Sequence, residues 1–256
     1  MSRTLLILVV VAIVVYLAFC VLLFVSQRSM IYYPQPPSPA MGASNFTLQT
    51  DGARLQITAM PRNGPDAVVY FGGNAEDVNF SLPELNAAFP TCAIYLMHYR
   101  SYGGSSGKPS EDGLVSDALA LFDKIKADHS NVIVIGRSLG SGVAVHLASM
   151  RSVAGLVLIT PFDSLVALAA RQFPYFPVRW LMLDKFESWR YAEKVTAPTL
   201  VVAAERDEVI PRSSTEALYA RFRAGVATLK VISGTGHNTI SESPAYLASL
   251  KSVRSR

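Results

Sequence analysis

The sequence contains few cysteines and few histidines. Among its 256 residues there are 2 cysteines and 4 histidines. Cys20 lies in a long apolar run and Cys92 precedes a predicted strand, so we expect no disulfide between them. The histidines are far apart in the chain, and no Cys/His spacing typical of a metal site occurs. The sequence therefore predicts no metal centre.

Clustered charge is also scarce. Charged residues make up 16% of the chain and the net charge is +4, with Lys and Arg scattered along it. Nucleic-acid binding normally needs basic residues gathered on one face, so we expect none here. The glycine spacings of dinucleotide-binding and phosphate-binding loops are absent, which disfavours a nucleotide ligand. No internal repeat or low-complexity tract occurs.

One long apolar run is present at the N-terminus. Residues 4–25 include no charge in 22 positions, and as a helix they would span about 33 Å, enough for a hydrocarbon core. A cleaved signal peptide is the alternative, but the run is too long for such a peptide and no A-x-A site follows. Residues 17–20 resemble a lipoprotein cleavage box, in which Phe19 is too large. We expect an uncleaved, single-pass membrane anchor over residues 1–28.

Charges flanking this run favour one orientation. Arg3 and the amino terminus lie before it and Arg28 after it, a balance that leans toward a cytoplasmic N-terminus and a periplasmic or extracytoplasmic domain. Residues 29–42 follow as a linker, in which the proline-rich segment 35–39 forms a stiff spacer. The remaining positions, 43–256, suffice for one domain with a full core.

Strand and helix patterns alternate through this domain. Several of the apolar runs are continuous, as expected for parallel strands covered on both faces. The chain thus predicts an α/β fold with a mostly parallel, doubly wound sheet and helices on both faces. The expected strands are residues 55–60, 67–71, 93–98, 132–135, 155–160, 199–204 and 229–232. The expected helices are residues 80–88, 114–127, 141–150, 213–222 and 245–252.

One stretch interrupts the alternation. Residues 162–190 are rich in aromatic residues and leucine and are too long for an ordinary loop between two strands. They form either a helix packed on the core or a short cap whose apolar face lines an acyl-binding pocket. Both interpretations can hold together.

Residues 136–140 read GRSLG. They directly follow a predicted buried strand and lead into a helix rich in small residues. This is the arrangement of a nucleophile elbow, in which a serine sits on a tight, strained turn at the edge of a sheet. Glycines two residues away on each side avoid clashes in that turn. Ser138 is therefore the candidate nucleophile.

A serine nucleophile needs a base to take its proton. His237 lies in the glycine-containing loop after the last predicted strand, where it can reach the elbow. His98 ends an earlier strand and is the second candidate. His129 and His146 lie in or near helices and are expected to be structural.

The base in turn needs a carboxylate that fixes its tautomer. Asp207 follows the predicted strand 199–204, and its neighbours Glu205 and Glu208 are expected to be solvated loop charges. The order Ser138, Asp207, His237 is the serine–acid–histidine order of α/β-hydrolases.

An oxyanion hole requires two backbone N–H groups aimed at the developing charge. One is expected from Leu139, directly after the nucleophile, and the other from the glycine-rich turn after an early strand. Residues 71–75 read FGGNA, which makes Asn74 the second expected donor.

These residues and motifs together resemble the α/β-hydrolase superfamily, and more narrowly its small membrane-anchored members, a serine-aminopeptidase-like and depalmitoylase-like group. The resemblance covers nearly the whole chain. It rests on the segments SMIYYP (29–34), FGGNA (71–75), YRSYG (99–103), GKPSE (107–111), TPFDS (160–164) and GHN (236–238). Three positions depart from the pattern, since Gly72 replaces the usual histidine, His98 the usual aspartate and Ser101 the usual glycine. These departures bear on substrate preference more than on hydrolysis.

The sequence thus predicts a serine hydrolase that needs no cofactor and acts on acyl esters or thioesters. The resemblance implies a carboxylesterase, lysophospholipase-like or depalmitoylating activity, with a small-molecule or lipid-derived substrate. A serine peptidase of the aminopeptidase-like type is the enzymatic alternative, and a non-catalytic, membrane-tethered binding protein is the other. Acyl chain length, leaving group and oligomeric state are left open by the sequence.

Overall fold

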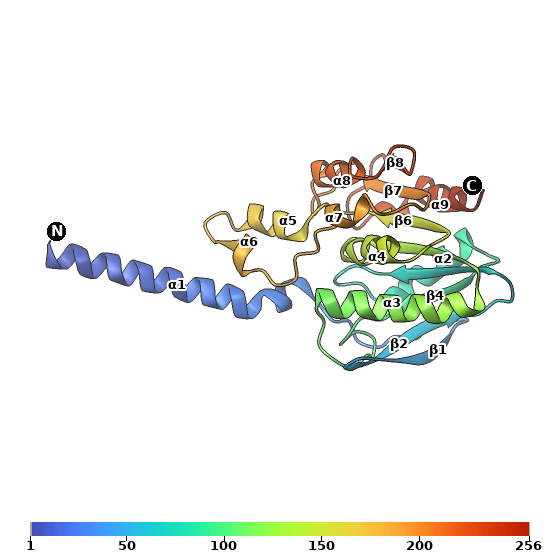
Figure 1. The fold of residues 1–256 in the computed structure, drawn as a ribbon, viewed down its shortest axis with the longest axis horizontal. Coiled ribbons are helices and arrows are strands. Elements are labelled where there is room, and N and C mark those ends of the chain that lie inside the picture. The colour runs from blue at the N-terminus through green and yellow to red at the C-terminus, as the bar shows by residue number, and fades with distance from the viewer. Residues whose placement is uncertain (1, 256) are drawn as a thin grey trace.

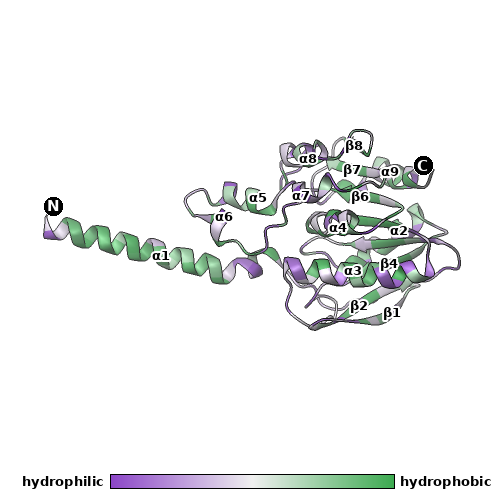
Figure 2. Cartoon of the chain, in the orientation of Figure 1, coloured by the Kyte–Doolittle hydropathy of each residue, from purple (hydrophilic) through white to green (hydrophobic). Residues whose placement is uncertain are grey.

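A computed structural model describes residues 2–255 of the chain. Its first element is α1 (Arg3–Ile31), which projects away from the body of the molecule (Figure 1). Ser2 caps this helix by accepting the N–H of Leu5 with its side chain. The residues of α1 are hydrophobic along most of the helix and more hydrophilic near its ends (Figure 2). Its mean hydropathy over an 18-residue window is 3.4, so the helix is long and apolar enough to cross a membrane.

Within residues 2–255 the strands form one eight-stranded sheet in the order β1-β2-β4-β3-β5-β6-β7-β8. β1 and β2 pair antiparallel, as do β2 and β4, and all further pairs are parallel. The carboxyl ends of the parallel strands therefore meet at one edge, where the site lies. The strands are β1 (Ser44–Thr50), β2 (Ala53–Met60), β3 (Asp66–Phe71), β4 (Ala93–Met97), β5 (Asn131–Arg137), β6 (Gly155–Ile159), β7 (Thr199–Ala204) and β8 (Ala227–Ile232).

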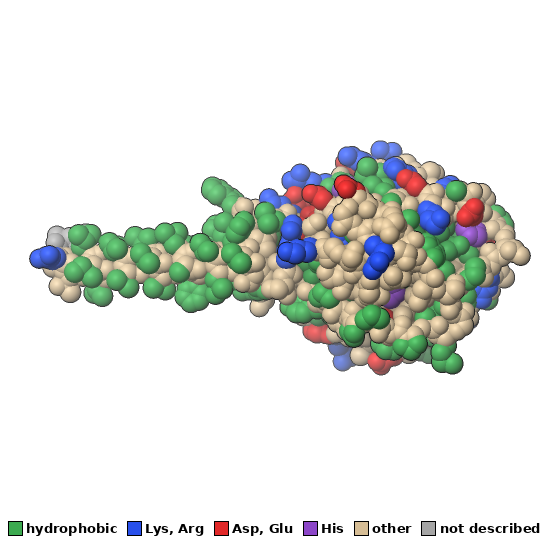
Figure 3. Space-filling view, turned by 90° about the horizontal axis from the view of Figure 1, so that it is seen from below, with side chains coloured by type: hydrophobic (Ala, Val, Ile, Leu, Met, Phe, Trp, Pro, Cys, Tyr) green, Lys and Arg blue, Asp and Glu red, His purple; other side chains and the backbone are tan. Residues whose placement is uncertain are grey.

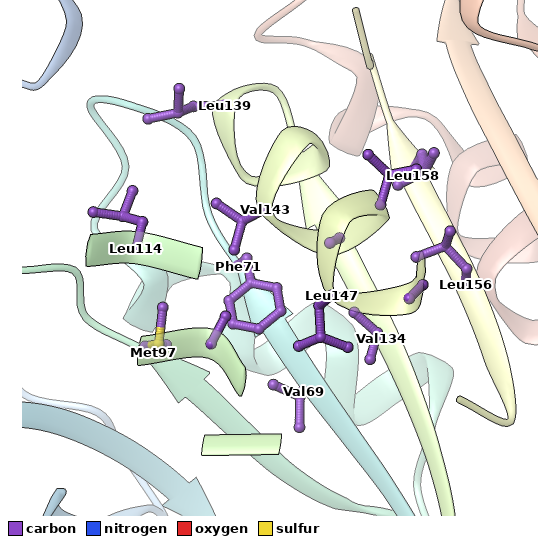
Figure 4. Packing of buried hydrophobic residues seen from close by; sticks show 14 of the residues in the cluster. Val69, Phe71, Met97, Leu114, Val134, Leu139, Val143, Leu147, Leu156 and Leu158 are labelled. Carbon is purple, nitrogen blue, oxygen red and sulfur yellow. The ribbon is translucent and has the colours of Figure 1, made fainter. Parts of the chain in front are cut away.

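Helices cover both faces of the sheet. On one face, side chains from β3, β4 and β6 interdigitate with those of α3 and α4 (Figure 4). On the other face, α2 and α9 pack over a second buried cluster that includes Val68, Ile135 and Val202. The helices of the body are α2 (Leu82–Ala88), α3 (Glu111–Asp128), α4 (Leu139–Met150), α8 (Arg212–Tyr219) and α9 (Pro244–Lys251). Three 3-10 turns lie at Val78–Ser81, Ile240–Glu242 and Ser252–Ser255.

The α/β fold class expected from the sequence is confirmed, but its edge strand β1 was not expected. This strand has no buried residue, and its sequence, SNFTLQT, contains only two large apolar residues. It is held by its full antiparallel register with β2, from the Ser44–Ala59 pair to the Thr50–Ala53 pair. A half-exposed edge strand gives no continuous apolar run, and the prediction relied on such runs.

The segment expected to be a linker, residues 29–42, begins inside α1 and is docked on the body. Ile31 and Tyr32 are buried in the main hydrophobic cluster. The backbone N–H of Tyr33 is bonded to the carbonyl of Asn74, and the side chain of Asn74 donates to the carbonyl of Ile31. The junction between α1 and the domain is consequently fixed at several points.

The stretch 162–190 forms a small cap between β6 and β7. It contains α5 (Leu165–Gln172), α6 (Val178–Leu181) and the start of α7 (Trp189–Ala192). In Figure 1, α5 and α6 extend from the body toward α1. Ser164 caps α5 by accepting the N–H of Ala167. The cap packs on the core and lines a cavity, while the binding of an acyl chain there stays a prediction.

Candidate active site

Ser138 lies on the sharp turn between β5 and α4. Its backbone has φ +49° and ψ −117°, a conformation that residues with a side chain rarely adopt. Such strain persists only where the surroundings enforce it, and here the Ser138 N–H is bonded to the carbonyl of Ile159 on β6. The turn therefore presents the serine at the carboxyl edge of the sheet.

The structure brings Ser138, His237 and Asp207 together. His237 Nε2 is 3.0 Å from Ser138 Oγ, and His237 Nδ1 is 2.9 and 3.0 Å from the two carboxylate oxygens of Asp207. The side chains of His237 and Asp207 are only 7% and 4% exposed. Asp207 Oδ1 also accepts the N–H groups of Val209 and Ile210, which fixes the carboxylate in place. Asp207 is thus positioned to orient the imidazole, which in turn reaches the serine.

The two glutamates beside Asp207 contact the histidine loop through its backbone. Glu208 Oε2 accepts the N–H of His237 at 3.1 Å, and Glu205 Oε2 accepts the N–H of Gly234 at 2.8 Å. Neither carboxylate is hydrogen-bonded to the imidazole. Both glutamates are exposed, as expected for solvated loop charges, and both also hold the loop that presents His237.

His98, the second candidate base, has a different environment. Its Nε2 is hydrogen-bonded to Thr58 Oγ1 at 2.9 Å, and its Nδ1 faces Gly103 so closely that a Cβ there would lie 2.0 Å away. Burial lowers the pKa of this imidazole and so favours its neutral form. His98 therefore belongs to a buried polar cluster beneath the loop that contains Gly103.

The other two histidines occupy structural positions, as expected. The ring nitrogens of His129 are bonded to the hydroxyl of Tyr95 and the carbonyl of Gly64. The ring of His146 stacks on Tyr191 with centroids 3.7 Å apart.

Two backbone N–H groups beside Ser138 have no partner among the described residues. They belong to Leu139, at the first turn of α4, and to Asn74, in the turn after β3. Both residues line the same cavity as Ser138. The N–H of Gly73, by contrast, is hydrogen-bonded to Glu76 Oε2 at 2.7 Å and is therefore occupied.

Sequence reasoning missed Glu76. Its second oxygen, Oε1, accepts the hydroxyls of Tyr70 and Ser81, each at 2.6 Å. The carboxylate therefore ties the glycine-rich turn to β3 and to the 3-10 turn that follows. An acidic residue three positions after a glycine pair was the available signal, but such a residue is usually a helix-start charge.

An apolar cavity of about 400 Å³ opens beside Ser138. Leu165, Leu168 and Phe173 of the cap line one side, and Leu139 and Ile210 lie near the serine. Its size is within the range of small-molecule sites. Residues of α1 form a further wall, which the sequence did not predict. Among the described residues there is no group of three or more His, Cys, Asp or Glu side chains that could hold a metal.

Comparison with known families identifies the family to which the chain belongs. A model of the alpha/beta hydrolase family matches residues 68–195, half of the chain. A second model, described as serine aminopeptidase S33, matches residues 182–244. The first match covers β3, the elbow and the cap, so the chain belongs to the α/β-hydrolase superfamily.

Relatives occur in bacteria and animals. An uncharacterized protein of Mycobacterium tuberculosis, Rv2307c, is 37% identical over 248 residues, covering 90% of this chain and 87% of the relative. The human alpha/beta hydrolase domain-containing protein 17C is 37% identical over 164 residues, covering 62% of this chain and 48% of that protein. The match to the animal protein thus spans about half of its length.

Solved structures share the fold at low sequence identity. The esterase Pf2001 of Pyrococcus furiosus superposes with a TM-score of 0.72 at 19% identity, covering 88% of this chain and 99% of the esterase. Mouse alpha/beta hydrolase domain-containing protein 10 superposes with a TM-score of 0.65 at 16% identity, covering 83% and 97%. These similarities show that the fold is shared.

Proposed function

We propose that this protein is a membrane-anchored serine hydrolase that cleaves acyl ester or thioester bonds through an acyl-enzyme on Ser138. The supporting observation is the continuous set of contacts from Asp207 through His237 to Ser138 Oγ. A base within hydrogen-bond reach of a serine, itself oriented by a buried carboxylate, is the arrangement that activates a hydroxyl for attack on a carbonyl.

In the first half-reaction Ser138 Oγ attacks the substrate carbonyl and its proton passes to His237 Nε2. The bond to the leaving oxygen or sulfur then breaks, and His237 returns the proton to the leaving group. In the second half-reaction water gives a proton to His237 and attacks the acyl-enzyme. The carboxylic acid leaves, and Ser138 regains its proton.

The backbone N–H groups of Leu139 and Asn74 are proposed to stabilise the oxyanion. Both are free of other partners among the described residues and adjoin the nucleophile. One such donor contributes about 3–4 kcal/mol to transition-state stabilisation. The proton on His237 Nδ1 faces Asp207 throughout the reaction. The imidazolium formed when Nε2 takes the serine proton is therefore stabilised by that carboxylate.

Membrane attachment through α1 is part of the proposal. The helix has 29 residues, and only 6% of its most apolar window is buried against the rest of the molecule. Leaving this apolar surface in water would be costly, while a bilayer accommodates it. Flotation of the full-length protein with lipid vesicles, resistant to high salt and alkaline carbonate, is the expected result. The cytoplasmic position of the N-terminus remains a prediction from the flanking charges.

A fluorophosphonate probe tests the chemistry directly. We expect the full-length wild type to be labelled and Ser138→Ala to be unlabelled, with p-nitrophenyl ester hydrolysis reduced at least about a thousandfold. Ser141→Ala is a matched control, because this hydroxyl bonds only the Ser138 carbonyl. Labelling that survives in Ser138→Ala would remove Ser138 as nucleophile. An unlabelled, inactive wild type would favour the tethered binding protein.

Peptide hydrolysis is the second candidate function, favoured by the serine aminopeptidase match over residues 182–244. The cavity beside Ser138 is mostly apolar, and within residues 2–255 no acidic side chain lines it to hold a peptide amino group. We therefore expect esters to be cleaved much faster than aminoacyl p-nitroanilides. Faster cleavage of the anilides would reverse this assignment.

A further inference from the structure

One wall of the cavity beside Ser138 is built by the apolar N-terminal helix itself. Five residues of α1 line it: Leu23, Phe24, Gln27, Met30 and Ile31. Their spacing of one, four, seven and eight positions places them on one helical face. The cap supplies the facing wall through α5 and residues 173–182. The cavity therefore extends along the last turns of α1 and ends at the nucleophile.

Polar contacts fix α1 against the cap. Gln27 Oε1 accepts the N–H of Leu183 at 2.7 Å, and the Arg28 guanidinium donates to both oxygens of Asp184 at 2.9 and 3.3 Å. The Asp184 side chain is 5% exposed and also accepts the N–H of Glu111. A paired, largely buried carboxylate of this kind holds its partners in one arrangement. The helical wall is thus a fixed part of the site.

The tip of the cap contacts α1 much further along the helix. The hydroxyl of Tyr16 donates to the carbonyl of Tyr175, and the rings of Tyr16 and Phe176 stack with centroids 5.7 Å apart. Tyr16 lies nine residues before Val25, which is about 13 Å along the helix axis. The cap therefore extends alongside the apolar run rather than ending at its border.

The length of a bilayer core then places the cap tip in lipid. A spanning helix needs about 20 apolar residues, and Arg3 sets the earliest border of the run. The hydrocarbon must consequently extend to about residue 24, which puts Tyr16 and the cap tip beside it well inside. The cap tip is suited to this depth, since Tyr175 and Trp180 are 85% and 89% exposed. Figure 3 shows apolar side chains along α1, with basic groups on the body beyond it.

The nucleophile lies at a different level. Asn74, next to Ser138 in the cavity, is bonded to Ile31 at the end of α1. Ile31 is six residues beyond Val25, at most about 9 Å beyond the hydrocarbon along the helix axis, at the outer side of the lipid headgroup layer. The ester bonds of membrane lipids lie a few Å closer to the hydrocarbon, at the inner border of that layer, with their acyl chains extending inward.

We propose that α1 and the cap together form a lipid-facing entrance through which the acyl chain of a membrane lipid ester enters the cavity directly from the bilayer. The chain lies against Leu23 and Phe24, and the ester carbonyl reaches Ser138 at headgroup level without crossing water. The proposal rests on the serine hydrolase activity and membrane anchoring proposed above, and it makes α1 a determinant of acyl specificity.

A pair of neighbouring substitutions on α1 tests whether this helix forms a wall of the acyl-binding cavity. Leu23→Trp fills the end of the cavity far from Ser138, whereas Leu22→Trp places the same side chain on the lipid-facing side, where Leu22 is 58% exposed. The full-length protein in phosphatidylcholine vesicles is assayed with palmitoyl and butyryl monoacylglycerols. We expect the palmitoyl-to-butyryl ratio of kcat/KM to fall at least tenfold in Leu23→Trp and to stay within twofold of wild type in Leu22→Trp. Equal ratios in the two variants would overturn the role of α1.

The depth of the cap tip in the bilayer is measured separately, in an experiment that does not require enzyme activity. With both native tryptophans replaced by phenylalanine, a single tryptophan is introduced at Tyr175 or, as control, at Asp128. Asp128 ends α3, about 25 Å along that helix from Glu111, which contacts the α1–cap junction. Phosphatidylcholine with a spin label on its acyl chains should quench the fluorescence of Tyr175→Trp strongly and that of Asp128→Trp hardly at all. Equal quenching overturns the bilayer entrance.

The two readouts separate failure of this inference from failure of the proposed function. Loss of esterase activity in every assay would overturn the hydrolase assignment, while the quenching result would still decide where the cap lies. Strong quenching of Tyr175→Trp could be accompanied by faster cleavage of an S-palmitoyl peptide than of any lipid ester. That outcome would overturn the membrane lipid ester as substrate. Cleavage of the lipid ester with the ratio shift in Leu23→Trp supports it.

Discussion

His237 Nε2 lies 3.0 Å from Ser138 Oγ, although 99 residues separate the two in sequence. Ser138 follows β5 in the middle of the sheet, and His237 follows the edge strand β8. The loop after β8 reaches back across the carboxyl edge and is held there by Glu205 and Glu208. The pairing of His237 with Ser138 therefore depends on a loop whose position is fixed by acidic side chains from the neighbouring β7 loop.

The first prediction separates the two candidate histidines. His237→Ala should reduce kcat for p-nitrophenyl butyrate at least about a thousandfold, because no other base reaches Ser138 Oγ among the described residues. His98→Ala should keep activity per folded molecule within about threefold. It should lower the melting temperature, since Thr58 Oγ1 loses a buried partner. If turnover were lost in His98→Ala but kept in His237→Ala, the base would be His98 and the assignment to His237 would be wrong.

The second prediction concerns the carboxylate. Asp207→Asn should reduce kcat about ten-thousandfold, because an amide favours the wrong imidazole tautomer and does not stabilise the imidazolium. Glu208→Gln keeps an oxygen that can accept the His237 N–H, and kcat should fall by no more than about threefold. Steady-state kinetics on both variants check this. Similar losses in the two would mean that Glu208 shares the role of Asp207.

The third prediction is that Glu76 positions the turn at residues 71–75, which contains the proposed oxyanion donor Asn74. Glu76→Ala frees the Gly73 N–H and loosens the turn that holds Asn74, so kcat should fall about tenfold to a hundredfold with little change in KM. Glu76→Gln retains an acceptor for Gly73 and should recover most of the activity. A merely structural role would instead lower the melting temperature of both variants while leaving kcat per folded molecule unchanged.

The fourth prediction is a pH dependence of stability. Burial raises the pKa of the Glu84 carboxyl from 4.5 to about 7, against the opposing effect of Arg137. Because the folded state then holds this proton more tightly than the unfolded chain, the contribution of Glu84 to stability is fully present below pH 4.5. It is lost as pH rises through 7. Glu84 is half-exposed, so solvent screening limits the effect to about 1 kcal/mol.

Glu84→Gln tests that sign. The variant cannot ionise, so its free energy of unfolding should decline less than that of wild type between pH 5 and pH 8. Urea unfolding at several pH values measures the difference. A wild type that gains stability relative to the variant over this interval would contradict the raised pKa.

Much of this fold could be predicted from apolar runs. The parallel strands β3 to β7 are buried on both faces, so their sequences are almost uninterrupted hydrophobic segments. The juxtaposition of Ser138, Asp207 and His237, the proposed triad, could be predicted in the same way, since each follows a strand and the ends of parallel strands converge. Their coming together is a consequence of the topology.

The contribution of α1 to the cavity could not be predicted in the same way. A helix that is apolar on every side hides which face is buried, so the face containing Leu23, Gln27 and Ile31 had no distinguishing pattern. The docking contacts depend on single polar residues, Gln27 and Arg28, whose partners lie more than 150 positions away. Only the folded chain reveals such pairs.

The two glycines of the elbow have a consequence for how its pentapeptide is interpreted. A Cβ on Gly136 would lie 2.3 Å from the carbonyl oxygen of Gly140, and one on Gly140 would lie 2.1 Å from that of Phe71. Both glycines are required by the packing of β5, α4 and β3, independently of any reaction. A descendant that had lost the proposed nucleophile would still need them, so evolutionary loss of the proposed activity would show first at position 138 while the two glycines persisted.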